Sequence, residues 1–121
     1  MIFALRLVHI LLGVFWVGSV LFIASFLAPA VRATGAAGGA VMSHVMQARK
    51  LHHVMMTAAL LTILSGFGLA WLVAGSLGFE WYATGMGRAI GFGAILTIVA
   101  AVLGATVNAP TAQRLAKLAA G

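Results

Sequence analysis

The 121-residue chain contains no cysteine and only one acidic residue, Glu80. Without cysteine it has no disulfide, no thiolate metal ligand and no cysteine nucleophile. One carboxylate side chain is too few for a carboxylate-pair hydrolase or for a carboxylate-bound magnesium or calcium ion. Charged residues make up only 7% of the chain, against about a quarter in a soluble domain. The chain is therefore poorly suited to an aqueous surface, and enzymatic activity of its own is not expected.

Hydrophobic residues make up 64% of the chain, and they gather in three segments that each reach the roughly 20 residues needed to cross a bilayer. We expect an all-α integral membrane protein, with a single membrane domain over residues 1–121 and a bundle of three transmembrane helices. The predicted helices cover about 2–30, 40–75 and 88–108. A short amphipathic C-terminal helix, over about 110–119, is expected to lie on the membrane surface.

Local signals set the predicted boundaries of the first two helices. Pro29 is expected to end the first helix, and the glycine-rich stretch TGAAGGA, residues 34–40, to form a linker. The stretch VMSHVMQARKLHH, residues 41–53, contains no helix breaker. The second helix is therefore expected to begin near Ala40 and to run unbroken into its apolar segment.

The net charge of +6 is placed at the ends of the apolar segments. One side of the membrane is expected to hold the larger basic group, which comprises Arg32, Arg49, Lys50, Arg114 and Lys117. Arg6 and Arg88 fall on the other side, with Glu80. Because basic residues mark the cytoplasmic side, we expect a multi-pass protein of the bacterial inner membrane with its N-terminus outside and its C-terminus cytoplasmic. Basic groups at these positions meet the lipid bilayer, so nucleic acid is not an expected partner.

His9 is an ionisable residue within the apolar stretch LVHILLGVFWVGSVLF, residues 7–22. At helical spacing it shares a face with Gly13 and Trp16. In one interpretation His9 is an axial haem ligand, Gly13 leaves a notch for the plane of the haem, and Trp16 packs on it. In the other, His9 forms a hydrogen bond to a neighbouring helix, and the glycine allows close packing. Ionisable groups inside a membrane are commonly functional, and both interpretations stay open.

A second group of histidines and methionines precedes and opens the second apolar segment: Met42, His44, Met46, His52, His53, Met55 and Met56. On an unbroken helix, Met42, Met46, His53 and Met56 would share one face. Imidazole and thioether groups are ligands for haem iron or copper(I). His52 or His53 is thus a candidate haem ligand, and both, with these three methionines, are candidate copper ligands. Alternatively, the methionines fill gaps in packing and the histidines mark the membrane interface.

His9 and His53 are expected to lie too far apart to share one haem within the chain. If the midpoints of the first two helices, near Val17 and Leu64, are level, the two histidines are roughly 25–30 Å apart along the membrane normal. A haem at His9 would then need its second ligand from elsewhere, such as another subunit.

The first two helices resemble a group of small bacterial membrane proteins that includes copper-resistance-D-like proteins and the membrane-type protoporphyrinogen oxidase. The resemblance is carried by LVHILLGVFWVGSVLF followed by LAPAV, and by RKLHHVMMTAALLTILSGFGLAWL. The matching positions are His9, Trp16, Gly18 and Pro29 in the first helix, and Arg49, Lys50, His52 or His53, and Ser65-Gly66 in the second. It implies a bundle of four-helix type that handles haem b or copper; here only three spans are predicted, so one helix of the pattern is absent or is supplied by a partner.

Three functions follow as hypotheses. The first is a small haem-b-associated membrane protein that acts as an electron-transfer component or as the membrane anchor subunit of a larger redox complex. The second is a copper-handling membrane protein. The third is an accessory subunit that binds no cofactor and packs against other membrane subunits, or against copies of itself, through its glycine faces.

Overall fold

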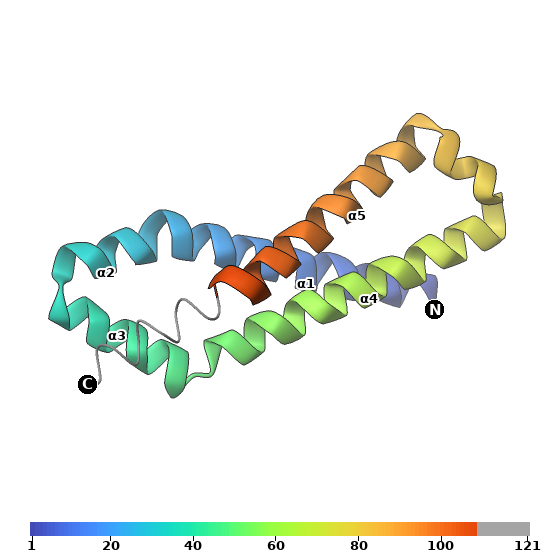
Figure 1. The fold of residues 1–121 in the computed structure, drawn as a ribbon. Coiled ribbons are helices and arrows are strands. Elements are labelled where there is room, and N and C mark those ends of the chain that lie inside the picture. The colour runs from blue at the N-terminus through green and yellow to red at the C-terminus, as the bar shows by residue number, and fades with distance from the viewer. Residues whose placement is uncertain (109–121) are drawn as a thin grey trace.

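The computed structural model describes residues 1–108, and this part of the chain is helical with no strand. Its elements, in order, are α1 (Ile2–Phe22), the π-helical turn η1 (Ile23–Leu27), α2 (Ala28–Thr34), α3 (Ala36–Gln47), α4 (Leu51–Leu77), the 3₁₀ turn η2 (Phe79–Ala83), α5 (Gly85–Leu103) and the π-helical turn η3 (Gly104–Asn108). Figure 1 shows the long first helix, the return through α3 and α4, and α5 running back. The predicted surface helix, about 110–119, lies outside the described residues.

Three helices are long and apolar enough to cross a membrane: Ile2–Thr34, Leu51–Leu77 and Gly85–Thr106. The prediction of three membrane-length helices is thereby confirmed by length and composition. Most of their large apolar side chains are exposed, including Phe15, Trp71 and Phe92 at 47%, 74% and 64%. Exposed apolar surface on this scale suits contact with lipid and would be an aggregation hazard in water.

The first helix does not end near Pro29, contrary to the sequence-based expectation. The chain passes from α1 through η1 into α2 without leaving the helical path, and Pro29 lies in the first turn of α2. A proline ring clashes with the carbonyl group four residues earlier and offers no N–H group. The wider π-helical turn over Ile23–Leu27 immediately precedes Pro29, and such turns are a common way to accommodate a local disruption of the helix. The helix continues to Thr34.

The chain turns at Gly35, not along the whole predicted linker 34–40. Gly35 has a φ of +57°, which a glycine adopts without steric cost, and α3 begins at the next residue. α3 packs against α2, so these two short helices form a hairpin. The remaining glycines of the stretch are helical.

The helix expected over 40–75 is broken between Gln47 and Leu51. Lys50 has the left-handed φ of 49° and precedes the first residue of α4. This conformation ends α3 and gives α4 a new direction, as Figure 1 shows. Because most residues other than glycine, asparagine and aspartate are uncommon in this region, a lysine there carries no recognisable breaker signal.

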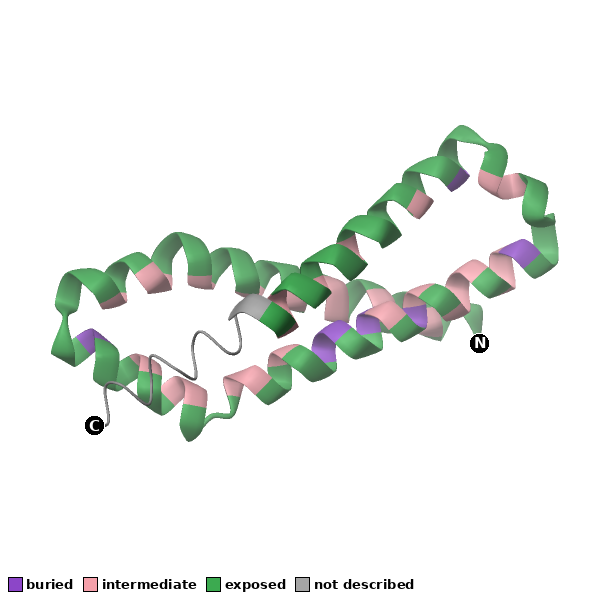
Figure 2. Ribbon diagram, in the orientation of Figure 1, coloured by how far each residue is buried: buried purple, intermediate pink, exposed green. Residues whose placement is uncertain are grey.

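The main packing contact of the described chain is between α1 and α4, which run antiparallel. Gly68 approaches the side chain of Leu5, and Gly13 approaches that of Thr62; a Cβ atom built on each glycine would lie 3.3 Å and 3.5 Å from the facing methyl carbon. The buried residues of α4 are small and fall largely on the side that meets α1, which Figure 2 shows in purple: Ala58, Ala59, Thr62, Ser65 and Ala74. Small side chains permit the close approach that helix pairs in membranes need.

The turn η2 connects α4 to α5. The Tyr82 hydroxyl donates a hydrogen bond to the carbonyl oxygen of Ala70, at 3.0 Å, and so ties the turn to α4. Thr84 then caps α5, since its hydroxyl oxygen accepts a hydrogen bond of 3.1 Å from the backbone N–H of Gly87. The third predicted helix, about 88–108, corresponds to α5 together with η3.

We predict that Gly38→Ala destabilises the α2–α3 hairpin, whereas Gly39→Ala does not. A Cβ atom on Gly38 would overlap the Thr34 hydroxyl and lie only 2.6 Å from the carbonyl oxygen of Val31. Gly39 has nothing within 4 Å of such an atom. Overpacking of this kind costs typically about 1–3 kcal/mol, which thermal unfolding in detergent followed by circular dichroism can measure. Equal stability of the two variants would contradict this packing.

Candidate functional site at the α1–α4 contact

His9 connects α1 to α4 through its ring nitrogen Nδ1. This atom lies 2.9 Å from the carbonyl oxygen of Thr62 and 3.1 Å from the hydroxyl oxygen of Ser65. The Ser65 hydroxyl itself donates to the Thr62 carbonyl, at 3.0 Å. Three polar groups from two helices are thus joined in one small network inside an otherwise apolar contact.

This network fixes the tautomer of the His9 imidazole. A carbonyl oxygen can only accept a hydrogen bond, so Nδ1 must carry the proton that is donated to Thr62. In the neutral ring the other nitrogen, Nε2, then holds a lone pair. Within residues 1–108 no hydrogen-bond partner is found for Nε2, and it is not a buried unpaired atom. The structure therefore leaves one nitrogen of His9 able to act as a ligand.

The network is built on a stripe of small and hydroxylated residues along α4. Ala58, Thr62 and Ser65 follow each other at spacings of four and three residues, so they lie on one face of the helix. Each is at most 6% exposed. The Thr62 hydroxyl donates to the carbonyl oxygen of Ala58, at 2.7 Å, so it is satisfied within its own helix and presents its methyl group to α1.

Gly66 makes room for the imidazole. A Cβ atom on Gly66 would lie 2.9 Å from Cε1 of His9 and 3.4 Å from its Nδ1. The ring therefore rests directly on the backbone of α4. In the sequence, Ser65-Gly66 matches the pattern of the resembling proteins, but nothing there singles out Thr62 or connects these positions to His9. The signal that could have found them is the run of small and hydroxylated positions within an apolar helix.

Gly13 and Trp16, the other residues of the predicted haem face, are separated by the packing. Gly13 faces the methyl group of Thr62, so the notch beside it is taken up by α4. Trp16 instead lines a shallow cleft between α1 and α5, together with Val20, Leu96 and Ala100 among others. The three residues share a side of α1, but His9 and Gly13 face α4, whereas Trp16 lines the cleft beside α5.

The observed helix register brings His9 closer to His53 than the sequence predicted, although not close enough to share an iron ion. His9 lies opposite Thr62 to Gly66, whereas midpoints at Val17 and Leu64 would have placed it about seven residues further along α4. The offset is about two helical turns, or roughly 10 Å. Ser65, which faces His9, is twelve residues after His53 on α4. The separation of His9 and His53 along the helix axis is therefore roughly 18 Å, whereas the predicted separation is roughly 25–30 Å.

The candidate ligands at the other end of α4 are divided between two helices. Met42 and Met46 lie on α3, whereas His53 and Met56 lie on α4 beyond the break at Lys50. The single helical face predicted for these four residues therefore does not exist. His52 and His53 are adjacent, with ring centroids 5.7 Å apart, but no group of three or more His or acidic side chains able to hold a metal ion occurs in residues 1–108.

We predict that Gly66→Ala weakens the α1–α4 contact, whereas Gly75→Ala on the same helix does not. The new methyl group on residue 66 would press on the His9 ring, while a Cβ atom on Gly75 has nothing within 4 Å. We expect a loss of about 1–3 kcal/mol for the first variant, because the backbone of α4 cannot move away without disturbing the buried stripe. Thermal unfolding in detergent would measure it; two equally stable variants would show that His9 does not rest on Gly66.

Comparison with known proteins adds no assignment: no family model, no curated protein and no solved structure matches the chain.

Proposed function

We propose that this chain is a membrane anchor subunit of a redox complex and that it contributes His9 as one axial ligand of a haem b. The observation that carries the proposal is the hydrogen bond from Nδ1 to the Thr62 carbonyl oxygen. A histidine that ligates a metal almost always donates its other ring N–H to a carbonyl or carboxylate oxygen, which fixes the tautomer and the direction of the free nitrogen. His9 has this arrangement in the described structure.

A haem at His9 would be shared with another subunit or with a second copy of this chain. The described residues offer one ligand atom at this position, because Nε2 of His9 would hold a lone pair, whereas the other three histidines lie on α3 or at the start of α4. They enclose no cavity for the macrocycle at His9, because the space beside Gly13 is filled by Thr62 and the space beside Gly66 is filled by the His9 ring. Haem b supplies one-electron transfer when bound. This chain would hold one side of it through Nε2 and fix that nitrogen through Thr62.

A second candidate function is a cofactor-free accessory subunit, and the same contact supports it. His9 joins α1 to α4 by a hydrogen bond within a stripe of small residues, which is how polar side chains stabilise helix pairs in membranes. The spans Ile2–Thr34 and Gly85–Thr106 bury none of their apolar windows within the described chain. Such faces are available to lipid or to a neighbouring subunit. The copper hypothesis has no comparable support and stays a prediction.

The proposed location is the bacterial inner membrane, with the N-terminus outside. Arg32, Arg49 and Lys50 lie at the end of the molecule formed by the α2–α3 hairpin and the start of α4. Arg6 and Arg88 lie toward the end formed by the start of α1 and by η2. The larger basic group supports a cytoplasmic position for the hairpin end.

Replacing His9 by asparagine separates the two candidate functions. The side-chain amide of asparagine can still donate to the Thr62 carbonyl oxygen, but it has no nitrogen lone pair to offer iron. We therefore expect His9→Asn to fold with nearly unchanged thermal stability and to lose the Soret band of protein purified from cells supplied with haem. His44→Asn, at an exposed position on α3, is the matched control and should keep the band.

A colourless wild-type protein isolated in gentle detergent together with the subunits that co-purify with it, or a Soret band that His9→Asn leaves unchanged, would overturn the haem proposal. His9→Ala provides the complementary measurement, because it removes both the ligand and the hydrogen bond. We expect it to unfold at a lower temperature than His9→Asn, by an amount that corresponds to about 1 kcal/mol. A colourless protein with this order of stability would support the accessory-subunit function.

A further inference from the structure

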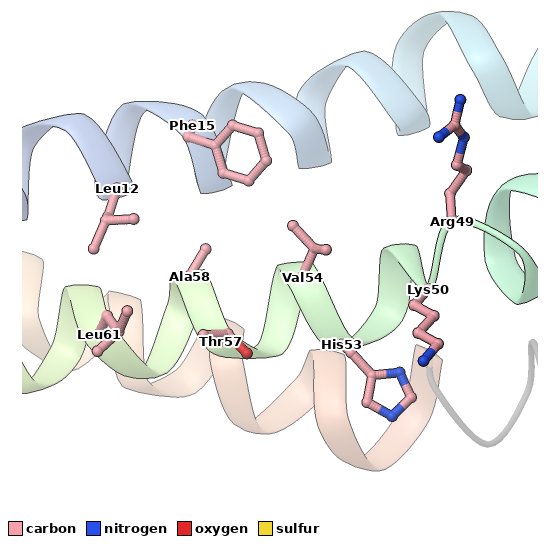
Figure 3. Close-up of a pocket in the computed structure, with 9 residues that line it drawn as sticks. All are labelled: Leu12, Phe15, Arg49, Lys50, His53, Val54, Thr57, Ala58 and Leu61. Carbon is pink, nitrogen blue, oxygen red and sulfur yellow. The ribbon is translucent and has the colours of Figure 1, made fainter.

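An open groove of about 490 Å³ lies between α1 and the first half of α4, away from the His9 network. Leu12 and Phe15 line it from α1, and Val54 and Leu61 line it from α4. Figure 3 shows Phe15 and Val54 facing each other across it, with Ala58 on its floor beside them. Phe15, Val54 and Leu61 are each more than 40% exposed, so the groove opens outward.

Two basic residues stand at one end of this groove. Arg49 and Lys50 line the groove together with His53 at the start of α4. In Figure 3 the Arg49 side chain rises toward the first helix, whereas Lys50 and His53 point to the other side of α4. Both basic residues are exposed. The end of the groove thus carries two positive charges, and apolar side chains line most of the rest of it.

These positive charges have no acidic side chain near them. Glu80 is the only acidic residue of the chain, and it lies in η2, beyond the opposite end of the 27-residue α4. The length of α4 alone is roughly 40 Å at 1.5 Å per residue. At this distance an ion pair is impossible, so Arg49 and Lys50 are available to an external anion.

The groove has the length of one membrane leaflet. From Lys50 to Leu61 is eleven residues, which corresponds to roughly 16 Å along α4. The hydrocarbon core of a bilayer is about 30 Å thick, so one leaflet is about half of that. Since Lys50 immediately precedes a membrane-length helix, its position marks the interface. The groove therefore runs from the headgroup level to about the middle of the bilayer.

We propose that this groove binds an anionic phospholipid. Its phosphate would lie at the basic end of the groove against Arg49, with Lys50 adding positive charge from the other side of α4, and one acyl chain would lie along Leu12, Phe15, Val54 and Leu61. A guanidinium group and an ammonium group both donate hydrogen bonds to phosphate oxygens, and a zwitterionic lipid lacks the net negative charge that two basic residues favour. Thr57, which also lines the groove, is an exposed hydroxyl midway along an otherwise apolar wall and is not needed for binding.

The test is lipid retention measured by native mass spectrometry on the full chain in mild detergent. Phosphatidylglycerol and phosphatidylcholine with the same acyl chains are added in turn, and glycerol 3-phosphate serves as a headgroup without a chain. The wild type is expected to retain phosphatidylglycerol in preference to the other two. Arg49→Gln with Lys50→Gln should weaken this binding roughly fivefold for each basic residue removed. The charge-matched control is Arg6→Gln with Arg88→Gln, which should bind as the wild type does.

A second pair of variants tests the groove separately from the charges. Val54→Trp fills the groove and should reduce phosphatidylglycerol retention, whereas Leu60→Trp, at an exposed position of α4 outside the groove, should not. Equal binding of phosphatidylglycerol and phosphatidylcholine would overturn the proposal. Equal loss of phosphatidylglycerol binding in the two double variants, the one at Arg49 and Lys50 and the one at Arg6 and Arg88, would overturn it too. The proposal would also be overturned if the Arg49 and Lys50 variant lost phosphatidylglycerol while Val54→Trp retained it, because the groove would then play no part. Tight binding of glycerol 3-phosphate, which has no acyl chain, would lead to the same conclusion.

Discussion

The contact between α1 and α4 organises the membrane-length part of this chain, and the hydrogen bond from His9 to the Thr62 carbonyl lies at its centre. In a bilayer two apolar helices gain little by leaving lipid, so close packing and polar contacts must hold them together. The stripe of small residues on α4 allows the approach, and the His9 network sets the level at which the helices meet. A one-turn slip would carry the imidazole off Gly66 and leave its donor without the carbonyl.

The same bond connects packing to chemistry. An imidazole has two nitrogens, and a neutral ring cannot donate from both. Because Nδ1 is committed to Thr62, the helix contact itself determines that Nε2 carries the lone pair. A structural histidine and a ligating histidine are therefore not competing descriptions of His9, since one nitrogen can serve each role. What separates them is whether a partner brings a haem to Nε2, which explains why sequence analysis left both interpretations open.

The three membrane-length helices could be predicted because hydropathy over about 20 residues is a property of composition alone. The breaks and the register could not. Pro29 is a strong helix-ending signal, yet the π-helical turn before it lets the helix continue to Thr34. Lys50 has no breaker signature, yet its left-handed backbone divides α3 from α4 and separates Met42 and Met46 from His53. The pairing of His9 with Thr62 depends on two helices at once, so no periodicity within either one reveals it.

The register also determines which part of the first helix extends past the start of α4 at the basic end. With His9 opposite Ser65, antiparallel helices place Lys50 level with about residue 24, whereas the predicted register would have placed it level with Val31. About ten residues of the first helix, roughly 15 Å, then extend past Lys50. They include α2, which carries Arg32 and is paired with α3. At 12 residues, or roughly 18 Å, α3 is too short to cross a membrane, so the hairpin is suited to the headgroup region. A register set by one half-buried histidine thus brings Arg32, Arg49 and Lys50 to the same end of the described helices, and the groove between α1 and α4 opens toward that end.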